Sequence, residues 1–555
     1  MPLQRFGAFE LACLTTVCLA AGGRRAFAQA VAPAVAARVN AVFGRYNAST
    51  PGCELLVRMN GQAAYVHSYG LASLESGVPI TPRTVFNLAS ASKEFTAASV
   101  MLLAASGKLS LDDDIRKYVP ELPNLGATVT IRQLLTHTSG WRDYIQLLVW
   151  QGHEVRDHVS ARDALNVLER QRALNFEPGT AFAYSNTGYF LLGLVVQRVS
   201  GESLPQFARE HIFEPLGMQD TRYVDDTRDV VPRRAVAYER APNGTWREAM
   251  SGWDLVGDGG VQSTAEDLAK WDDEFESGRV GGRALVDLLV APEHLSTGAR
   301  VPYGFGLFVD TYGGRRRVWH NGIWAGYRSL FMRFPDAHLT IIALCNAADA
   351  PSEQLGDAIA DIMLPKSPGA ATPPVWARVR NADHLAGDYY SGATNQRVSV
   401  IADSGRPALA GPPMVPLALV GPRRFGVGTS ELEFLPPNGE AQTMLAHNDG
   451  RTSVYRRVGP ALDRSAFPQY EGRYWSDELG VGYSVTMKAD TLELRDGRGE
   501  STPLVPLFRD GFDGPGTVRF ERDSAGVVMA MTFTTRGVDA LPFTRVRERA
   551  DGRTP

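Results

Sequence analysis

The chain has 555 residues, of which 44% are apolar and 21% are charged. This length exceeds one ordinary domain, and the apolar content is sufficient for a large buried core. The net charge of −4 gives no electrostatic reason to expect a nucleic acid or an acidic membrane surface as a partner. We therefore expect a globular protein of several domains that does not bind nucleic acid.

The first thirty residues have the features of an export signal. Arg5 precedes a short apolar stretch, Leu11 to Gly22, and Ala26-Phe27-Ala28 then offers a small-x-small cleavage site. The apolar stretch is too short to cross a bilayer. We predict a signal peptide over residues 1–28, export to the periplasm or beyond, and no transmembrane anchor. A disordered start on a cytoplasmic protein is the alternative.

Two cysteines, Cys53 and Cys345, remain after the predicted cleavage, and each lies in an apolar, strand-like segment. Exported proteins tolerate disulfides, and two cysteines allow one intramolecular bridge. Free cysteine also packs well as a small buried apolar residue. The sequence leaves both possibilities open.

In the region 29–364, strand patterns lie at both ends and a helical segment lies between them. Residues 53–70 indicate two strands joined by an Asn60-Gly61 turn, a strong hairpin signal. Helical patterns dominate from Ser90 to about Gly278, and strand patterns return after Pro302. We expect one antiparallel sheet assembled from both ends of this region, flanked by helices, with a helical lobe beside it.

A Pro- and Ala-rich stretch, which we assign as a linker over 365–380, separates this region from short alternating strands. An internal repeat appears there: Leu385–Ser391 matches Tyr470–Ser476, 85 residues further on. We predict two small antiparallel β-barrels, over 381–460 and 465–550, and an α+β fold class for the whole chain.

The most informative motif is Ser90-Ala-Ser-Lys93, at the start of an apolar helix. Residues i and i+3 share a helix face, so the Lys93 amine can lie beside the Ser90 hydroxyl. A serine hydroxyl is a poor nucleophile unless a base removes its proton. The alternative interpretation is a helix-capping serine followed by a solvated lysine.

Two later segments add further candidate residues. Tyr184-Ser-Asn186 precedes a helix, and alternate residues of an extended segment point the same way, toward one cleft. Alternatively, Asn186 caps that helix. His320-Asn-Gly322 ends a strand pattern, where glycine allows close backbone approach. By itself, His320 could also be an ordinary strand residue.

In this order, the three segments resemble the motifs of the serine beta-lactamase and penicillin-binding-protein superfamily, in particular its class C-like branch. The resemblance covers roughly Ala34 to Leu364. It implies that Ser90 attacks a carbonyl and forms an acyl-enzyme, while Lys93 and Tyr184 share the general-base role. The sequence does not decide which of the two is the base.

The same resemblance assigns the binding residues. Backbone N–H groups of Ser90 and Ile323, the latter following Gly322, would form the oxyanion hole, and Asn186 would hold a substrate amide. His320 would stand where the family often has a lysine that binds a substrate carboxylate. A largely neutral histidine binds anions more weakly, which favours a peptidase or esterase over a dedicated beta-lactamase.

The two predicted barrels resemble the three-domain architecture of D-aminopeptidases, in which a loop of the last barrel restricts the active site to substrates with a free amine. We take Arg509–Gly516 as the equivalent loop and Asp513 as the candidate amine binder. A solvated turn is the alternative for this Gly-rich segment.

We therefore predict a serine hydrolase that removes N-terminal D-residues from short peptides, amides or esters. An esterase, or a D,D-carboxypeptidase or beta-lactamase-like hydrolase, is the alternative, and a non-catalytic binding protein is the third possibility. His137 is expected to support the site rather than to react. The histidines show no metal-ligand spacing, so we predict no metal and no cofactor. A homodimer is left open.

Overall fold

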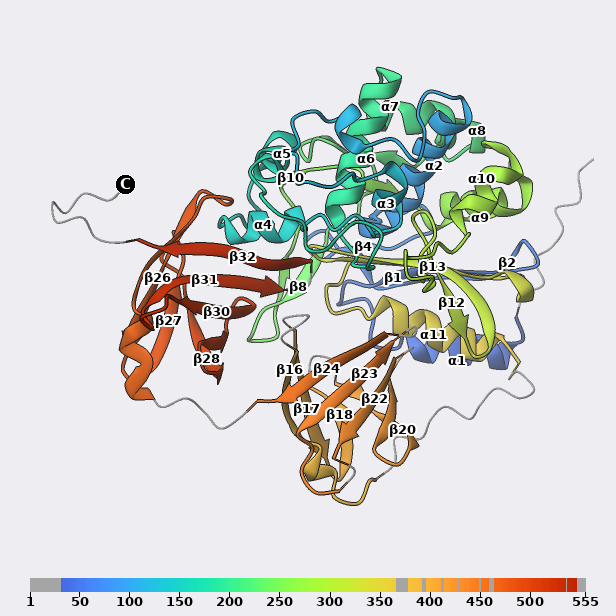
Figure 1. Ribbon diagram of the computed structural model, residues 1–555. Helices are drawn as coiled ribbons and strands as arrows, with labels where there is room; N and C mark the ends of the chain where they lie inside the picture. The colour runs from blue at the N-terminus through green and yellow to red at the C-terminus, as the bar shows by residue number, and fades with distance from the viewer. Residues whose placement is uncertain are drawn as a thin grey trace, which may run out of the picture.

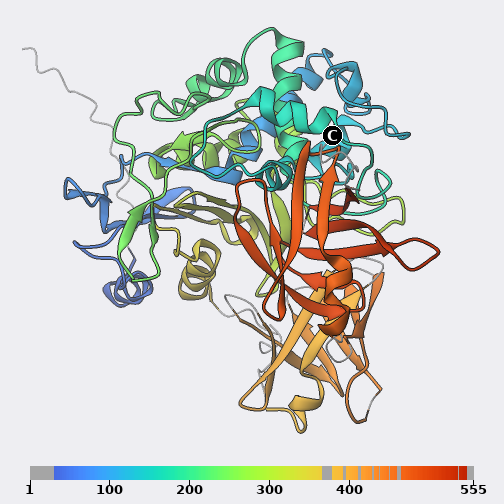
Figure 2. The ribbon, with the colours of Figure 1, turned by 90° about the vertical axis from the view of Figure 1, so that its left-hand side faces the viewer.

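The computed structural model describes residues 31–365, 378–391, 396–410, 414–427, 430–436, 438–448, 451–458, 464–535 and 537–546. The predicted signal peptide and most of the predicted linker lie outside these residues. The described part forms a mixed helix-and-sheet domain and two β units that lie to one side of it (Figures 1 and 2). The predicted α+β fold class is confirmed.

A six-stranded antiparallel sheet is the centre of the mixed domain, and both ends of the domain contribute to it. Its strand order is β12-β13-β14-β15-β1-β2. The first two strands of the domain thus lie beside its last four strands in one sheet. The strands are β1 (Cys53–Met59), β2 (Gln62–Tyr69), β12 (Phe308–Tyr312), β13 (Arg315–Trp324), β14 (Tyr327–Phe334) and β15 (Leu339–Cys345).

Helices cover both faces of the sheet, so that successive residues of β1, β14 and β15 are buried rather than alternate ones. Helices α1 and α11 pack on one face and share a core with it, while α9 and the helical lobe pack on the other. The helices are α1 (Pro33–Val42), α2 (Lys93–Ala105), α3 (Ile131–Leu135), α4 (Tyr144–Trp150), α5 (Ala161–Glu169), α6 (Asn186–Ser200), α7 (Leu204–Ala208), α8 (Glu214–Leu216), α9 (Ala265–Ser277), α10 (Gly282–Leu289) and α11 (Ser352–Met363).

Short strands connect the lobe to the sheet. Three of them form a small sheet in the order β5-β11-β7. Its strand β5 comes shortly before α2, the helix that carries Lys93. The short strands are β3 (Leu71–Ser73), β4 (Val78–Pro79), β5 (Phe86–Asn87), β6 (Val159–Ser160), β7 (Arg222–Tyr223), β8 (Tyr238–Arg240), β9 (Trp246–Glu248), β10 (Trp253–Asp254) and β11 (Val261–Ser263).

Cys53 and Cys345 form a disulfide between β1 and β15, where they are direct partners in the strand register. Their Cα atoms are 4.0 Å apart. Of the two possibilities that the sequence left open, the structure therefore has the bridge. It links residues 292 positions apart and closes the sheet where its early and late strands meet.

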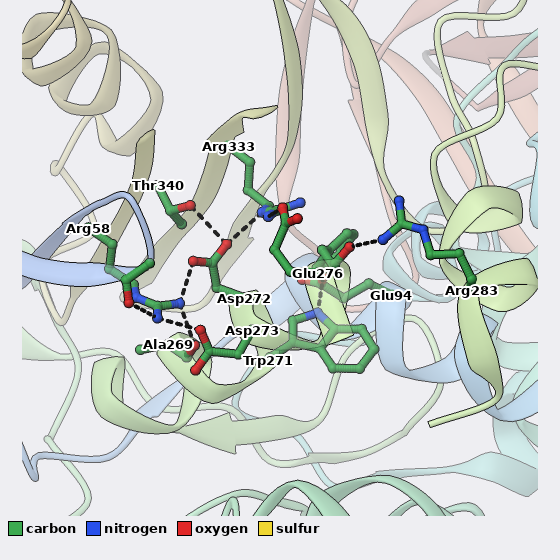
Figure 3. Close-up of polar contacts among 12 residues, drawn as sticks. Arg58, Glu94, Ala269, Trp271, Asp272, Asp273, Glu276, Arg283, Arg333 and Thr340 are labelled. Atoms are coloured by element: carbon green, nitrogen blue, oxygen red, sulfur yellow. Dashed lines mark hydrogen bonds and ion pairs between the residues drawn. The ribbon is translucent and has the colours of Figure 1, made fainter. Parts of the chain in front are cut away.

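A buried charge cluster fastens α9 to the sheet (Figure 3). Asp272 of α9 accepts hydrogen bonds from Arg58 of β1 and Arg333 of β14, and from the Thr340 hydroxyl of β15 at 2.8 Å. The side chains of Arg58, Asp272 and Arg333 are 7%, 6% and 8% exposed. Because each of these charges has a partner, their burial is tolerated.

The two β units differ in closure. The second is a closed eight-stranded barrel, whereas the first is a nine-stranded antiparallel sheet that nearly closes. The strands of the first unit are β16 (Gly387–Ser391), β17 (Gln396–Asp403), β18 (Arg406–Leu409), β19 (Val415–Pro416), β20 (Ala418–Gly421), β21 (Arg424–Val427), β22 (Ser430–Leu435), β23 (Thr443–Asn448) and β24 (Arg451–Arg457). Those of the second are β25 (Gly472–Ser476), β26 (Val481–Lys488), β27 (Thr491–Arg495), β28 (Ser501–Phe508), β29 (Gly511–Asp513), β30 (Thr517–Arg522), β31 (Val528–Thr535) and β32 (Val538–Arg545).

The internal repeat has the same geometry in both units. Tyr389 and Tyr474 each donate from the hydroxyl to the carbonyl four residues earlier, at 2.8 and 2.7 Å. The first strand of each unit pairs with its last strand at these tyrosines, opposite Arg457 and Arg545 respectively. The repeated sequence thus marks the strand at which each β unit closes on itself.

The second barrel is joined to the mixed domain by a continuous apolar core, whereas the first unit has its own. At this interface Arg142 and Glu478 form a buried ion pair at 2.6 Å, with each side chain 4% exposed. The Tyr483 hydroxyl also donates to the carbonyl of Trp150, at the end of α4, at 2.8 Å. The barrel therefore contacts the loop that leads into α4, seen at the left of Figure 1.

None of the helices among the described residues is both long and apolar enough to cross a membrane.

Candidate active site

Ser90 lies in a short 3-10 helix, η1 (Ala89–Ser92), directly before α2. The preceding residue, Ala89, has a φ of +49°, in the left-handed region that residues with a side chain rarely adopt. Its amide donates to the Asn87 side chain at 2.7 Å, which holds this sharp turn. The turn places Ser90 on the wall of a cavity of about 580 Å³.

Lys93, the first residue of α2, has no exposed surface and makes three hydrogen bonds. Its Nζ lies 3.2 Å from the Ser90 Oγ, 2.9 Å from the Asn186 Oδ1 and 2.7 Å from the Asp258 carbonyl oxygen. The last two atoms can only accept hydrogen bonds. When the amine is neutral, they therefore hold its two N–H bonds and leave its lone pair directed at Ser90.

The environment of Lys93 makes a neutral amine accessible. Burial lowers the pKa of Lys93 to about 8, against the opposing effect of the Asp258 and Asp143 carboxylates. An exposed lysine has a pKa near 10.4. Lys93 can thus lose its proton close to neutral pH, as a general base for Ser90 requires.

Asn186 begins α6 and connects Lys93 to Asp143. Its Nδ2 donates to the Asp143 Oδ2 at 2.9 Å, and its backbone N–H donates to the same oxygen at 2.6 Å. The other Asp143 oxygen accepts from the amides of Ile145 and Gln146, as the cap of α4. At the start of α6 it is thus the Asp143 carboxylate that accepts from the first backbone N–H. The Asn186 side chain does not cap this helix and instead accepts from Lys93.

Asp258 lies on the loop between β10 and β11 and is 6% exposed, yet it lines the cavity. Its two carboxylate oxygens lie 3.1 and 3.0 Å from the Tyr144 hydroxyl. Burial raises the pKa of Asp258 to about 6, and the Lys93 charge opposes that shift. Asp143, Tyr144 and Asp258 were missed by the sequence analysis, since none of them belongs to a spaced motif.

Tyr184 lies next to Lys93, with the lysine Nζ 4.9 Å from the centroid of its ring. His137 supports the other side: the two ring centroids are 4.3 Å apart, and the His137 Nδ1 accepts from the Ser185 amide at 3.2 Å. Burial lowers the pKa of His137 well below its usual value, with Lys93 adding to the effect. His137 is thus a neutral packing partner for Tyr184, as the sequence analysis expected.

His320 is buried behind the cavity wall, in β13. Its Nδ1 lies 2.6 Å from the Asn321 carbonyl oxygen, which fixes the proton on Nδ1, so that Nε2 accepts from the Tyr303 hydroxyl at 3.0 Å. Burial lowers the pKa of His320 to about 3. It is neutral at physiological pH and does not line the cavity, so it offers no cation for a substrate carboxylate. Tyr303 was not identified from the sequence.

Gly322 allows β13 to pack against η1. A Cβ on Gly322 would lie 2.0 Å from the Leu88 carbonyl oxygen and 2.3 Å from the Ser329 Oγ. The next residue, Ile323, is 59% exposed and lines the cavity together with Ser90. The missing side chain therefore brings the Ile323 backbone to the wall that carries Ser90.

Asp513 is not brought to this site. It lies in β29 and forms an ion pair at 2.6 Å with Arg397 of the first β unit, and it does not line the cavity. The second barrel contacts the active-site loop through Glu478, which pairs with Arg142, and through Gly537, which precedes β32. The Gly537 carbonyl oxygen accepts from the backbone N–H of Asp143 at 2.8 Å and from the side-chain Nδ2 of Asn175 at 2.9 Å.

The cavity also has a large apolar wall, which can receive a substrate side chain. It is formed by residues of β10, β13 and the connecting loops: Val224, Val231, Val236, Met250, Trp253, Leu255, Ile323 and Trp324. Within the described ranges, no group of three or more His, Cys, Asp or Glu side chains is arranged to hold a metal ion.

A serine with a buried lysine in hydrogen-bonding reach, at the start of a helix between a sheet and a helical lobe, defines a serine hydrolase. Comparison with known proteins agrees. The chain belongs to the beta-lactamase family, whose model matches residues 27–363. The predicted resemblance is confirmed.

Individual relatives cover different parts of the chain. Penicillin-binding protein 4* of Bacillus subtilis (strain 168) is 31% identical over 311 residues, 53% of this chain and 67% of that protein. A D-aminopeptidase of Brucella melitensis is 26% identical over 544 residues, 91% of this chain and 98% of that protein. A solved octameric penicillin-binding-protein homologue from Pyrococcus abyssi has a TM-score of 0.54 at 22% identity, covering 84% of this chain and 98% of its own, and bears on the fold alone.

Proposed function

We propose that this protein is a D-stereospecific aminopeptidase or amidase that releases N-terminal D-residues from short peptides, amides or esters through an acyl-enzyme. The observation that carries the chemistry is the hydrogen bonding of Lys93, in which two carbonyl oxygens direct the lone pair of the neutral amine at Ser90. The similarity to a D-aminopeptidase extends over 91% of the chain, including both β units, and supports the substrate class.

In the proposed reaction the Ser90 Oγ attacks the substrate carbonyl carbon while its proton passes to Lys93. The carbon–nitrogen or carbon–oxygen bond to the leaving group then breaks, and the leaving group takes up a proton from the Lys93–Tyr184 pair. Water attacks the resulting ester, and the same groups accept its proton and return one to Ser90. Bond making and bond breaking balance in both halves without an external reagent.

The negative charge that develops on the substrate oxygen would be met by the backbone N–H groups of Ser90 and Ile323. One such donor contributes about 3 kcal/mol to the stabilisation of a transition state. The proximity of β13 to η1 at Gly322 supports this role. We assign the substrate amide to Asn186, which lines the cavity and is held by Asp143.

An esterase acting on neutral substrates is the second candidate, because the apolar cavity wall would accept an acyl chain without a free amine. A penicillin-binding protein among the relatives keeps a D,D-carboxypeptidase-type or beta-lactamase-like hydrolase in the same group of alternatives. The neutral His320 provides no cation for a substrate carboxylate and argues against these last two.

The test is hydrolysis of D-alanine p-nitroanilide, beside the L-isomer, the N-acetylated D-substrate and a Ser90→Ala control. Turnover of the free-amine D-substrate alone, lost in the control, is the expected result. Ser90-dependent cleavage of simple esters without any amide turnover would leave an esterase.

We also propose that the protein is exported and works in the periplasm or outside the cell. The disulfide between Cys53 and Cys345 supports an oxidising compartment. N-terminal sequencing of the protein recovered from the periplasmic or the secreted fraction tests this, and a mature N-terminus near residue 29 is the expected result. Whether the protein is a homodimer is tested by its mass in solution.

A further inference from the structure

The buried charged groups around Ser90 carry a net negative charge. Lys93 is the cation, and the carboxylates of Asp143 and Asp258 both act on it. His137 and His320 are neutral, because burial lowers the pKa of each. Among these buried groups, one positive and two negative charges leave an excess of one negative charge, which favours a cationic ligand beside them.

Of the two carboxylates, Asp258 is the one that a ligand can reach. Asp143 is not part of the cavity wall, and its oxygens accept from four N–H groups of Ile145, Gln146 and Asn186. Asp258 lines the cavity, and the side chain that bonds to it is Tyr144, through one hydroxyl. A carboxylate has about four lone-pair positions, so Asp258 retains capacity for another donor.

The backbone of Asp258 bonds the same lysine as the nucleophile, and the Asp258 side chain belongs to a residue that lines the cavity together with Ser90. The Lys93 Nζ bonds both the Ser90 Oγ, at 3.2 Å, and the Asp258 carbonyl oxygen, at 2.7 Å. In an aminoacyl substrate the amine is two bonds from the carbonyl carbon that Ser90 attacks, so its partner must lie beside the nucleophile. The other charged residues on the cavity wall are Arg228, Asp229 and Glu248, which are exposed, and Arg234, which is half-buried.

We propose that Asp258 binds the free ammonium group of the substrate and that this binding helps to deprotonate Lys93. An ammonium paired with Asp258 cancels the negative charge that stabilises protonated Lys93. A substrate with a free amine would thus promote formation of its own base, whereas an N-acylated substrate would not. The inference rests on the proposed function for the identity of the substrate.

The expected pH behaviour follows from the groups that face Asp258 and Lys93. The titratable groups are Asp143, Tyr144, Tyr184, Tyr223, His137 and His320. Burial raises the pKa of Asp258 to about 6, so that it is ionised at pH 7, and its charge in turn raises the pKa of Lys93. Removing that charge therefore lowers the pH at which Lys93 becomes neutral.

Asp258→Asn is the test, with Asp229→Asn as a matched control on the exposed part of the same cavity. We measure kcat and KM for D-alanine p-nitroanilide and for p-nitrophenyl acetate, which has no amine, between pH 5 and pH 10. Asp258→Asn should raise KM for the amine substrate by about 10- to 100-fold. For the neutral ester, it should shift the acid limb of the profile to lower pH. Asp229→Asn should resemble wild type in both.

An equal loss on both substrates, with no shift of the ester profile, would show that Asp258 is merely structural. Unchanged selectivity for the free amine would place the ammonium elsewhere. If Asp258→Asn folds poorly, Tyr144→Phe is the second variant. It removes the hydroxyl that bonds Asp258 but keeps the Asp258 charge, so it should retain the preference for a substrate with a free amine. If wild type cleaves only esters, the proposed function fails. In that case the ester profile of Asp258→Asn, with and without added D-alanine amide, still decides whether Asp258 acts on Lys93 and binds an amine.

Discussion

Neutralising Glu478, which belongs to the second barrel, should impair both folding and catalysis. Glu478 pairs with Arg142 at 2.6 Å and also accepts from the Arg172 amide at 2.9 Å. Arg142 directly precedes Asp143, the residue that holds Asn186 against Lys93. In Glu478→Gln, the guanidinium stays buried without a counter-charge.

The size of the effect follows from burial. The side chains of Arg142 and Glu478 are each 4% exposed, and breaking a buried ion pair from one side costs about 3–5 kcal/mol. Because glutamine keeps a neutral hydrogen-bond acceptor, we expect the free energy of unfolding to fall by about 3 kcal/mol, the lower end of this range. Displacement of Asp143 should lower kcat by about tenfold, since small misplacements of catalytic groups are costly.

The control is the neighbouring residue. Asp477 pairs with Arg172 at 3.5 Å, but the two side chains are 62% and 69% exposed. Such surface pairs contribute about 0–1 kcal/mol, so Asp477→Asn should be close to wild type in stability and activity. Urea unfolding of wild type and both variants gives the free energies, and hydrolysis of a Ser90-dependent substrate gives kcat.

Equal stability of Glu478→Gln and Asp477→Asn would refute this reasoning, because it would mean that the Arg142 charge is not desolvated in the folded protein. The double variant Arg142→Met with Glu478→Leu refines the test. It removes both charges and should recover most of the stability, since apolar replacements of buried ion pairs are often neutral or stabilising. A double variant as unstable as Glu478→Gln would point to lost packing instead.

Three further predictions concern single residues. Gly322→Ala should reduce kcat by about 100-fold with KM little changed. The added Cβ would lie 2.0 Å from the Leu88 carbonyl oxygen and force β13 away from η1. A normal kcat would exclude the Ile323 N–H as an oxyanion donor. Activity on a neutral ester should rise with pH through the Lys93 pKa of about 8, since only the neutral amine accepts a proton, and a flat profile from pH 6 to pH 9 would contradict this. Burial raises the pKa of Glu94 to about 8, so wild-type stability should fall as pH rises toward that value. Glu94→Gln should then be the more stable form at pH 9 by more than ~1 kcal/mol in thermal unfolding, and no gain there would refute a neutral Glu94.

Several parts of the fold could be predicted because they depend on local patterns. The Ser90 and Lys93 pair follows from helix periodicity, and the two β units follow from a repeat whose Tyr389 and Tyr474 make the same hydrogen bond. The sheet built from both ends of the domain follows from apolar strand patterns on either side of a helical region. In each case the information lies within a few residues of the chain.

The supporting residues of the site could not be predicted in this way. Asp258 is 165 positions from Lys93 and reaches it through a loop that has no motif of its own. The expected barrel residue also differs from what the structure shows: Asp513 pairs with Arg397 and does not line the cavity, whereas Gly537 and Glu478 contact the loop before α4. A Gly-rich loop and a tight hairpin turn have similar sequence signals, and only docking of the barrel decides which one meets the site.

The sequence by itself indicated the family, the fold class and the contact between the Lys93 amine and the Ser90 hydroxyl, because these depend on short-range spacing. Tertiary structure decided the electrostatics. Burial lowers the pKa of Lys93 to about 8 and of His320 to about 3, and raises that of Asp258 to about 6. These shifts arise from desolvation and from charges brought together by folding, and a linear sequence specifies neither of them at a given residue.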